Sequence, residues 1–267
     1  MTINQVVAQA KHHLLSEDDI TLIKSAYNFA AQAHRGQKRI TGEPYLEHPL
    51  QTAFILAQMK LDAKTIAAGL LHDVPEDTKY KLADIKKIFG EDIAFLVDSV
   101  TKLSSLEYHG QTRYRESLKK MFLAMAKDVR VIFIKFADRL HNLRTLEYLP
   151  DTKRQAIANE TLNIYVPIAD LLGIWHLKWQ MEDLCFKYLH PTEYQELSQK
   201  YQIDKKLELN QYIKRMTKEL SQALDKLGIP HEINGRFKHL YSIWQKMQDK
   251  NRKFNEIYDV FALRVIV

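Results

Sequence analysis

The sequence predicts an all-α helical bundle, followed by a helical connector and the start of an α/β segment. Two observations support this prediction. From about residue 17 to residue 171, apolar residues recur at helical spacing in segments separated by short turns. The last eight residues, 260–267, are instead β-branched and apolar, as in a strand. With 267 residues and 46% hydrophobic content, the chain is long enough for one large domain, or for one domain and part of another.

The helices are predicted in order from the spacing of apolar residues. Ser16 followed by Asp19 resembles a capping box and predicts a first helix over residues 17–34. Further helices are expected at residues 50–58, 63–71, 82–89, 93–101, 114–126, 129–139 and 153–171. A last helix begins at Lys206 and stops at Gly228, with Pro230 as a stop signal beyond it.

The segment 260–267 predicts a buried strand, and the chain ends inside it. A domain seldom ends on its first core strand without a partner strand in the sequence, so we expect a truncated piece or split product of a longer protein. An unpaired strand exposes backbone hydrogen-bonding groups. The stub from Gly228 onward is therefore expected to be the most protease-sensitive part of the chain.

Composition narrows the class of protein. No apolar run approaches the roughly 18 residues of a membrane span, and the polar amino terminus lacks the layout of a signal peptide, which favours a cytoplasmic protein without membrane contact. Cys185 is the only cysteine, so no disulfide forms within the chain, and its helical surroundings are typical of a packed thiol. The net charge of +6 is spread along the sequence and suits an anionic nucleotide without selecting one function.

The residues His48, His72, Asp73 and Asp138 predict a metal site. Two imidazoles and two carboxylates suit a divalent ion such as Mn²⁺, with positions left for water and a phosphate oxygen. Adjacent residues on a helix point about 100° apart, so His72 and Asp73 share one ion only if distant segments complete the shell. Isolated histidines and aspartates elsewhere are more typical of core or capping residues, and the pattern leaves His141 unassigned.

Glu76 and Asp77 follow Asp73 by three and four residues. If the helix continues through Pro75, this spacing keeps a carboxylate on the metal-facing side, where it takes the proton of an attacking water. Pro75 favours instead a bend or a helix start, which swings both carboxylates over the site. The alternative reading is a surface acidic pair at a helix start.

Arg39 is a candidate phosphate clamp, because a guanidinium offers a planar fork of donors to phosphate oxygens. The alternative for Arg39 is a salt bridge to Glu43 or Glu47.

Longer motifs surround these residues. The stretches 33–49, 72–78 and 137–146 closely resemble the hydrolase domain of the RelA/SpoT homologue family, which makes and degrades the alarmone (p)ppGpp. Residues 165–174 and 178–184 look like the helical connector of that family, and residues 235–244 and 258–264 look like the opening of its synthetase domain. The resemblance implies an HD-type hydrolase domain at 1–155, a connector at 156–200 and an incomplete, nucleotidyltransferase-like synthetase part at 201–267.

The resemblance also implies roles for single residues. Those matching Arg39, Thr41 and Asn142 help to hold the nucleotide, Thr145 adds a polar contact, and those matching Glu76 and Asp77 drive hydrolysis. In the synthetase part, Arg236, Lys238 and Lys246 match an ATP site, and Asp259 matches one of two metal-binding carboxylates; the second would lie beyond Val267. The alternative for the basic residues is a solvated helix face, and without the rest of that domain we favour it and expect the synthetase site to be vestigial.

Two positions depart from the family pattern. Ile40 replaces a basic or small polar residue beside the base, and Phe237 replaces a common proline. The first change puts the purine contacts in doubt, and the second affects only the synthetase part.

The resemblance implies a Mn²⁺-dependent guanosine-3′,5′-bis(diphosphate) 3′-pyrophosphohydrolase of the stringent response, which lacks synthetase activity and would need Mg²⁺ only with a complete synthetase domain. Its partners would be ppGpp and pppGpp, and ribosome binding in the family uses regions absent here; the sequence does not determine the oligomeric state. Two alternatives remain, namely a phosphohydrolase of another nucleotide on the same scaffold and a nucleotide-binding regulatory module without catalysis. The intact set of site residues argues against the second alternative.

Overall fold

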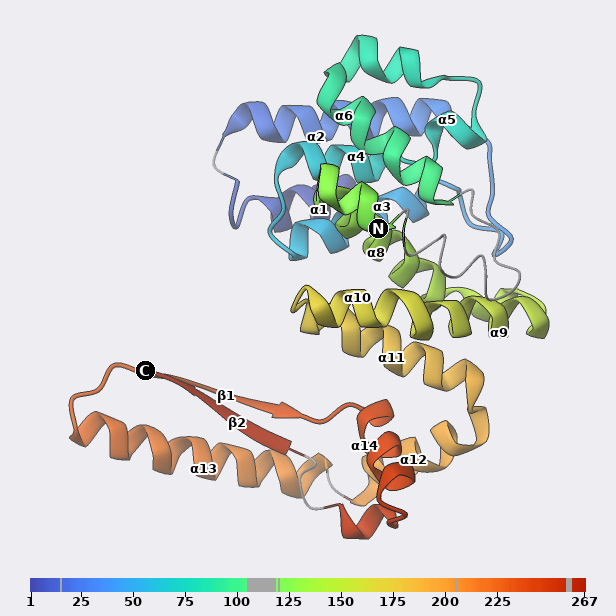
Figure 1. Ribbon diagram of the computed structural model, residues 1–267. Coiled ribbons are helices and arrows are strands. Elements are labelled where there is room, and N and C mark those ends of the chain that lie inside the picture. Colours follow the sequence, from blue (N-terminus) through green and yellow to red (C-terminus); the bar gives the residue numbers. More distant parts are fainter. Residues whose placement is uncertain (15, 105–118, 120, 205, 258–260) are drawn as a thin grey trace. The chain divides into compact units, whose positions relative to one another are not determined.

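The computed structural model describes the chain except for residues 15, 105–118, 120, 205 and 258–260 (Figure 1). It forms two compact units, Met1–Leu172 and Gly173–Val267. The division into functional parts at residues 155 and 200 stays a prediction, since compactness alone assigns no function to a segment. None of the helices in the described part of the chain is long and apolar enough to cross a bilayer.

The first unit is helical. Its elements are α1 (Ile3–Ala10), α2 (Glu17–Ala33), α3 (Glu47–Gln58), α4 (Ala63–Leu71), α5 (Val74–Asp77), α6 (Leu82–Ser104), α8 (Arg130–Arg144), the 3₁₀ helix η1 (Leu146–Tyr148), α9 (Asp151–Glu160), the π-helix η2 (Thr161–Tyr165) and α10 (Val166–Leu171). These bounds confirm the predicted helices, apart from the expected helix at 114–126. Part of that predicted helix lies outside the described residues. In its described part, residues 121–127 are helical.

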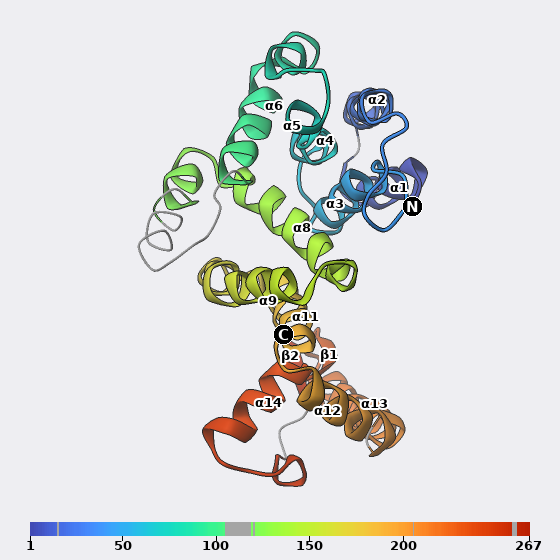
Figure 2. The same cartoon turned by 90° about the vertical axis from the view of Figure 1, so that its right-hand side faces the viewer.

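Helix α4 lies at the centre of this unit. Helices α2, α3, α6 and α8 all pack against it (Figures 1 and 2), and every residue of α4 except Lys64 is buried. Gly69 permits the close approach of α3, because a Cβ atom there would lie 2.5 Å from Leu56 Cδ1. The end of α4 is therefore held from several sides, and the residues that follow it start from a rigid position.

Local sequence explains where several helices start and bend. Ser16 caps α2 by accepting a hydrogen bond from the backbone N–H of Asp18, not of Asp19. Helix α6 breaks at Gly90, whose φ of 87° suits glycine, and this break separates the two helices predicted there. The π turn η2 comes directly before Val166 and Pro167, where the missing proline N–H interrupts the regular helical bonding.

A charged cluster joins the starts of two helices to α6. Arg130 at the start of α8 lies 3.7 Å from Asp62, 2.6 Å from Asp92 and 2.6 Å from Asp128. Asp62 also caps α4 by accepting from the backbone N–H of Thr65. Hydrogen bonds from Arg130 lower the pKa of Asp92 and of Asp128. We call these four charged residues the Arg130 cluster.

The second unit combines helices with a two-stranded sheet. Its elements are α11 (Trp175–Leu189), α12 (Pro191–Asp204), α13 (Lys206–Lys226), β1 (Glu232–Phe237), α14 (Leu240–Asp249), the 3₁₀ helix η3 (Phe254–Glu256) and β2 (Phe261–Ile266). Its core contains Phe186, Leu197, Ile243, Phe254 and Ile257. Cys185 on α11 is buried, which confirms that it is a packed thiol.

The predicted terminal strand forms as β2, but two expectations about it are wrong. It is paired, since it runs antiparallel to β1 from Glu232 opposite Ile266 to Phe237 opposite Phe261. It is also largely exposed and not buried, although the small sheet packs on α13. Strand β1 was not predicted from the sequence, because its polar residues and its glycine do not form a strand pattern. Pairing removes the reason given for protease sensitivity.

Candidate functional site

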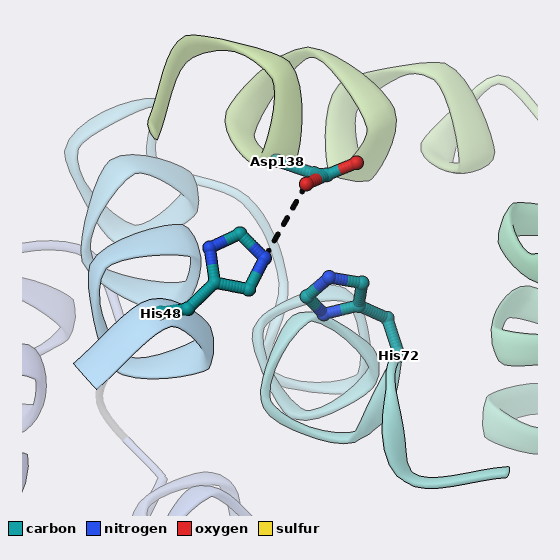
Figure 3. A group of neighbouring side chains, drawn as sticks. All are labelled: His48, His72 and Asp138. Atoms are coloured by element: carbon teal, nitrogen blue, oxygen red, sulfur yellow. Dashed lines mark ion pairs between the residues drawn. The ribbon is translucent and has the colours of Figure 1, made fainter. Parts of the chain in front are cut away.

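Three buried side chains meet where α3, α4 and α8 come together. His48 lies in the first turn of α3, His72 ends α4, and Asp138 lies in the middle of α8 (Figure 3). One ligand atom from each lies within 4.8 Å of the others, and His48 Nε2 is 3.3 Å from Asp138 Oδ1. The structure thus brings together three of the four predicted metal ligands, from segments as far apart in the sequence as residues 48 and 138.

Asp73 adds a carboxylate to this group. Its two oxygens lie 3.1 Å from His72 Nε2 and 3.5 Å from His48 Nε2. The helix does not continue through the pair, because α4 ends at Leu71 and Asp73 is the N-cap of the short helix α5, which has proline in its first turn. Of the two expectations for Pro75, the new helix start is confirmed. The break allows two adjacent residues to face one point.

The chemistry of this group fits a divalent ion. His72 Nδ1 lies 2.8 Å from the carbonyl oxygen of Gly69, which can only accept, so Nδ1 carries the proton. Nε2 of His72 is buried, makes no hydrogen bond and has its lone pair available. Burial opposes ionisation of Asp138, but the Lys135 ammonium beside it opposes this effect most strongly, and the pKa of Asp138 lies well below its usual range. Two imidazole nitrogens and two carboxylates form a mixed donor set suited to a divalent cation.

The two predicted catalytic carboxylates lie beside this group on α5. The Tyr45 hydroxyl lies 2.5 Å from Asp77 Oδ2 and 2.8 Å from Asp73 Oδ2, so it bridges both carboxylates. The Gln37 side chain donates to the carbonyl oxygen of Asp77 at 2.7 Å. Partial burial and the nearby charge of Asp73 raise the pKa of Glu76. Tyr45 is a site residue that was not predicted from the sequence, although it lies in the stretch 33–49 that resembles the family.

A cavity of about 250 Å³ opens next to Asp138. The predicted substrate contacts Arg39, Thr41, Asn142 and Thr145 all line it. Besides Asp138, its remaining lining residues are cationic or apolar, namely Ile40, Lys135, Arg139, Leu146, Leu149 and Ile157. The structure therefore places the predicted substrate residues together, at one side of the candidate metal ligands.

Two cationic residues of this cavity were not found from the sequence. Lys135 is buried, and its Nζ donates to Asp138 Oδ2 at 2.7 Å. Arg139 donates to Glu160 Oε1 at 2.8 Å and to the Tyr165 hydroxyl at 2.9 Å. The only sequence signal for Lys135 is its position three residues before Asp138, which places both on one face of α8.

Arg39 does not form the salt bridge considered as its alternative. Its guanidinium instead donates to Asn142 Oδ1 at 2.9 Å and lies 3.2 Å from His141 Nδ1. His141 is buried, and its Nδ1 is 2.7 Å from Nδ1 of His48. Burial, with His48 and Arg39 nearby, lowers the pKa of His141 to about 3, so its ring is neutral at neutral pH. His141, which the sequence pattern left unassigned, therefore belongs to the site.

The residues of the vestigial synthetase site lie in the second unit, and their roles stay predictions. Lys238 follows β1 and Lys246 lies on α14. For Arg236, on β1, the structure describes the backbone and not the side chain, and Asp259 lies outside the described residues.

Comparison with known proteins matches both units. The HD domain pattern matches residues 26–175, more than half of the chain, and the region found in RelA and SpoT proteins matches residues 235–267. The chain belongs to the RelA/SpoT homologue family. The predicted fold class, an all-α HD bundle followed by a small α/β segment, is confirmed.

Several relatives cover nearly the whole chain. It is 44% identical over 254 residues to the bifunctional (p)ppGpp synthase/hydrolase SpoT of Escherichia coli. This match covers 95% of this chain and 36% of the relative. It is 46% identical to a probable guanosine-3′,5′-bis(diphosphate) 3′-pyrophosphohydrolase of Synechocystis and 43% identical to a GTP pyrophosphokinase of Myxococcus xanthus, covering 92% and 94% of this chain. The chain spans about a third of the length of these relatives.

A solved structure supports the helical unit. A metazoan SpoT orthologue described as hydrolysing ppGpp matches with a TM-score of 0.51 and 30% identity, over 65% of this chain and 96% of that one.

Proposed function

We propose that this chain is a Mn²⁺-dependent hydrolase that removes pyrophosphate from the ribose 3′ position of ppGpp and pppGpp, leaving GDP and GTP, and so lowers alarmone levels in the stringent response. The observation that carries the proposal is the meeting of His48, His72 and Asp138, with Asp73 beside them, next to a cavity lined by Arg39. Names of relatives, such as SpoT and 3′-pyrophosphohydrolase, support the substrate.

The four candidate ligands, His48, His72, Asp73 and Asp138, would hold the ion. A bound divalent ion lowers the pKa of water and neutralises negative charge on phosphate. The two imidazoles would coordinate through Nε2, since Nδ1 of each ring already contacts another group. Lys135 holds one oxygen of Asp138 and orients that carboxylate.

The other site residues would bind substrate and move protons. Arg39 would clamp phosphate oxygens from the cavity wall, with the apolar lining left for the base. Water attacks the phosphorus next to the 3′ oxygen, and its proton passes to Glu76. The bond from phosphorus to the 3′ oxygen breaks, pyrophosphate is released, and the 3′ oxygen takes up a proton from solvent. A carboxyl whose pKa is raised above its ordinary value takes up a proton more readily, which suits this step. Asp77, held by Tyr45, would orient the water.

The test is release of pyrophosphate from 3′-labelled ppGpp with and without Mn²⁺, together with a panel of other nucleotides. We expect Mn²⁺-dependent release that is faster for ppGpp and pppGpp than for nucleotides without a 3′ diphosphate. The variant Asp138→Asn should lose release because it loses a charged ligand, whereas the control Asp18→Asn, on the exposed start of α2, should keep it. Faster hydrolysis of another nucleotide would indicate a different hydrolase, and tight ppGpp binding without turnover would indicate a regulatory module.

A further inference from the structure

A closed ring of contacts joins the candidate phosphate clamp to two candidate metal ligands. Arg39 contacts His141 Nδ1 at 3.2 Å and Asn142 Oδ1 at 2.9 Å. One branch continues from His141 Nδ1 to His48 Nδ1 at 2.7 Å. The other continues from Asn142 Nδ2 to Asp138 Oδ1 at 2.6 Å. The ring closes between Asp138 Oδ1 and His48 Nε2 at 3.3 Å.

The direction of each hydrogen bond in this ring follows from Arg39. A guanidinium only donates, so both groups that contact it must accept. The oxygen of the Asn142 amide therefore faces Arg39 and its NH₂ faces Asp138. In the other branch, His141 Nδ1 accepts from Arg39 and carries no proton. Two imidazole nitrogens at 2.7 Å need one proton between them, so Nδ1 of His48 is the donor, and the single lone pair of His141 Nδ1 is shared between His48 and the longer contact from Arg39.

This assignment has a direct consequence for the metal site. With a proton on Nδ1, His48 has only Nε2 left to bind a cation, and Nε2 faces Asp138 and Asp73. His72 reaches the same state more simply, because its Nδ1 contacts the carbonyl oxygen of Gly69. A carbonyl always accepts, whereas an imidazole accepts only when its own proton is on the other nitrogen. His141 Nδ1 therefore accepts from His48, as the Gly69 carbonyl oxygen accepts from His72, only while Arg39 keeps His141 Nδ1 unprotonated.

We propose that His141 is a positioning residue for metal binding, which orients the ring of His48 and fixes its proton on Nδ1, and that Arg39 imposes this arrangement on His141. The proposal rests on the metal site of the proposed function. It gives Arg39 a second role, since the side chain on the wall of the cavity also sets the state of a metal ligand. Groups that contact ligating histidines in this way typically change metal affinity by about 10- to 100-fold when they are removed.

The experiment measures Mn²⁺ affinity by calorimetric titration of the whole chain without nucleotide. His141→Leu removes the acceptor and should weaken binding by about 10- to 100-fold. His141→Asn places an amide oxygen near the position of Nδ1, and this acceptor should restore most of the affinity. Exposed His12 provides the control, and His12→Leu should bind as the unaltered chain does. Arg39→Met should weaken binding although no substrate is present.

Nitrogen-15 NMR of the histidine rings in the metal-free protein gives an independent readout. The unaltered chain should show His48 protonated on Nδ1 and His141 unprotonated on Nδ1, and His141→Leu should lose the first pattern. Equal Mn²⁺ affinity in His141→Leu and the unaltered chain, or no recovery in His141→Asn, would overturn the proposal. If His141→Leu does not fold, Arg39→Met and the ring spectra of the unaltered chain decide. Failure of the unaltered chain to bind Mn²⁺ would instead refute the proposed function itself.

Discussion

Tyr45→Phe offers a sharp test of the catalytic arrangement. The change removes the hydroxyl that lies 2.8 Å from Asp73 and 2.5 Å from Asp77. It leaves the ring, which stacks on His34 with centroids 4.6 Å apart, so packing should be retained. Burial and the two carboxylates raise the pKa of Tyr45, so the hydroxyl carries its proton throughout the working range of pH.

The expected magnitude follows from counting protons. Tyr45 has one hydroxyl proton, so the two contacts together count as one hydrogen bond to a charged group, of about 1.5–3 kcal/mol. If this free energy acts in the transition state, kcat/KM falls about 10- to 150-fold. A fall in kcat at saturating Mn²⁺ would place the effect at Asp77, whereas a loss of Mn²⁺ affinity would place it at Asp73.

The assay is pyrophosphate release from ppGpp over a range of substrate and Mn²⁺ concentrations. Tyr148→Phe serves as the matched control, because Tyr148 is 51% exposed. The reasoning is refuted if Tyr45→Phe and Tyr148→Phe have the same kcat/KM and the same Mn²⁺ affinity.

Four further predictions follow from the same structure. His72→Ala should remove one ligand and abolish metal retention while the helical content is kept, and elemental analysis showing full metal occupancy would contradict it. Glu76→Gln and Asp77→Asn should retain metal and substrate but lower kcat by about 10²- to 10⁴-fold, because an amide takes up no proton at position 76 and carries no charge to orient the water at position 77; an unchanged kcat in both would remove them from the mechanism. The 267 residues by themselves should make no ppGpp from ATP, GDP and Mg²⁺, because positioning dominates phosphoryl transfer and a two-stranded sheet holds too few groups; any ppGpp above a no-enzyme control would refute this. In the Arg130 cluster, two carboxylates with lowered pKa stabilise the fold above their ordinary pKa of 3.8, and this contribution is lost as pH falls through their lower, folded-state pKa. Arg130→Gln should therefore reduce stability at pH 7 more than at pH 3 in urea unfolding, and an equal loss at both pH values would contradict the assignment.

Much of the fold was predictable because it depends on local pattern. The start of α2 at Ser16, the span of α4 and the break of α6 at Gly90 follow from capping, apolar spacing and the conformational freedom of glycine. The strand β1 was not predictable in this way. Three of its six residues are polar and a fourth is Gly235, so the segment lacks a strand pattern. Pairing with β2 and packing of Gly235 against Ile213 stabilise it only in the folded chain.

The sequence by itself determined which residue types are available for chemistry, since two histidines, two aspartates and their flanking motifs are visible without coordinates. Only the tertiary structure decided which groups surround them. Arg39 and His141 are 102 residues apart in the chain, and Tyr45 is 28 residues from Asp73. A contact across such separations has no local pattern, because it depends on how α3, α4 and α8 pack. The roles inferred for Tyr45 and His141 therefore come from partners that only folding brings within hydrogen-bonding distance.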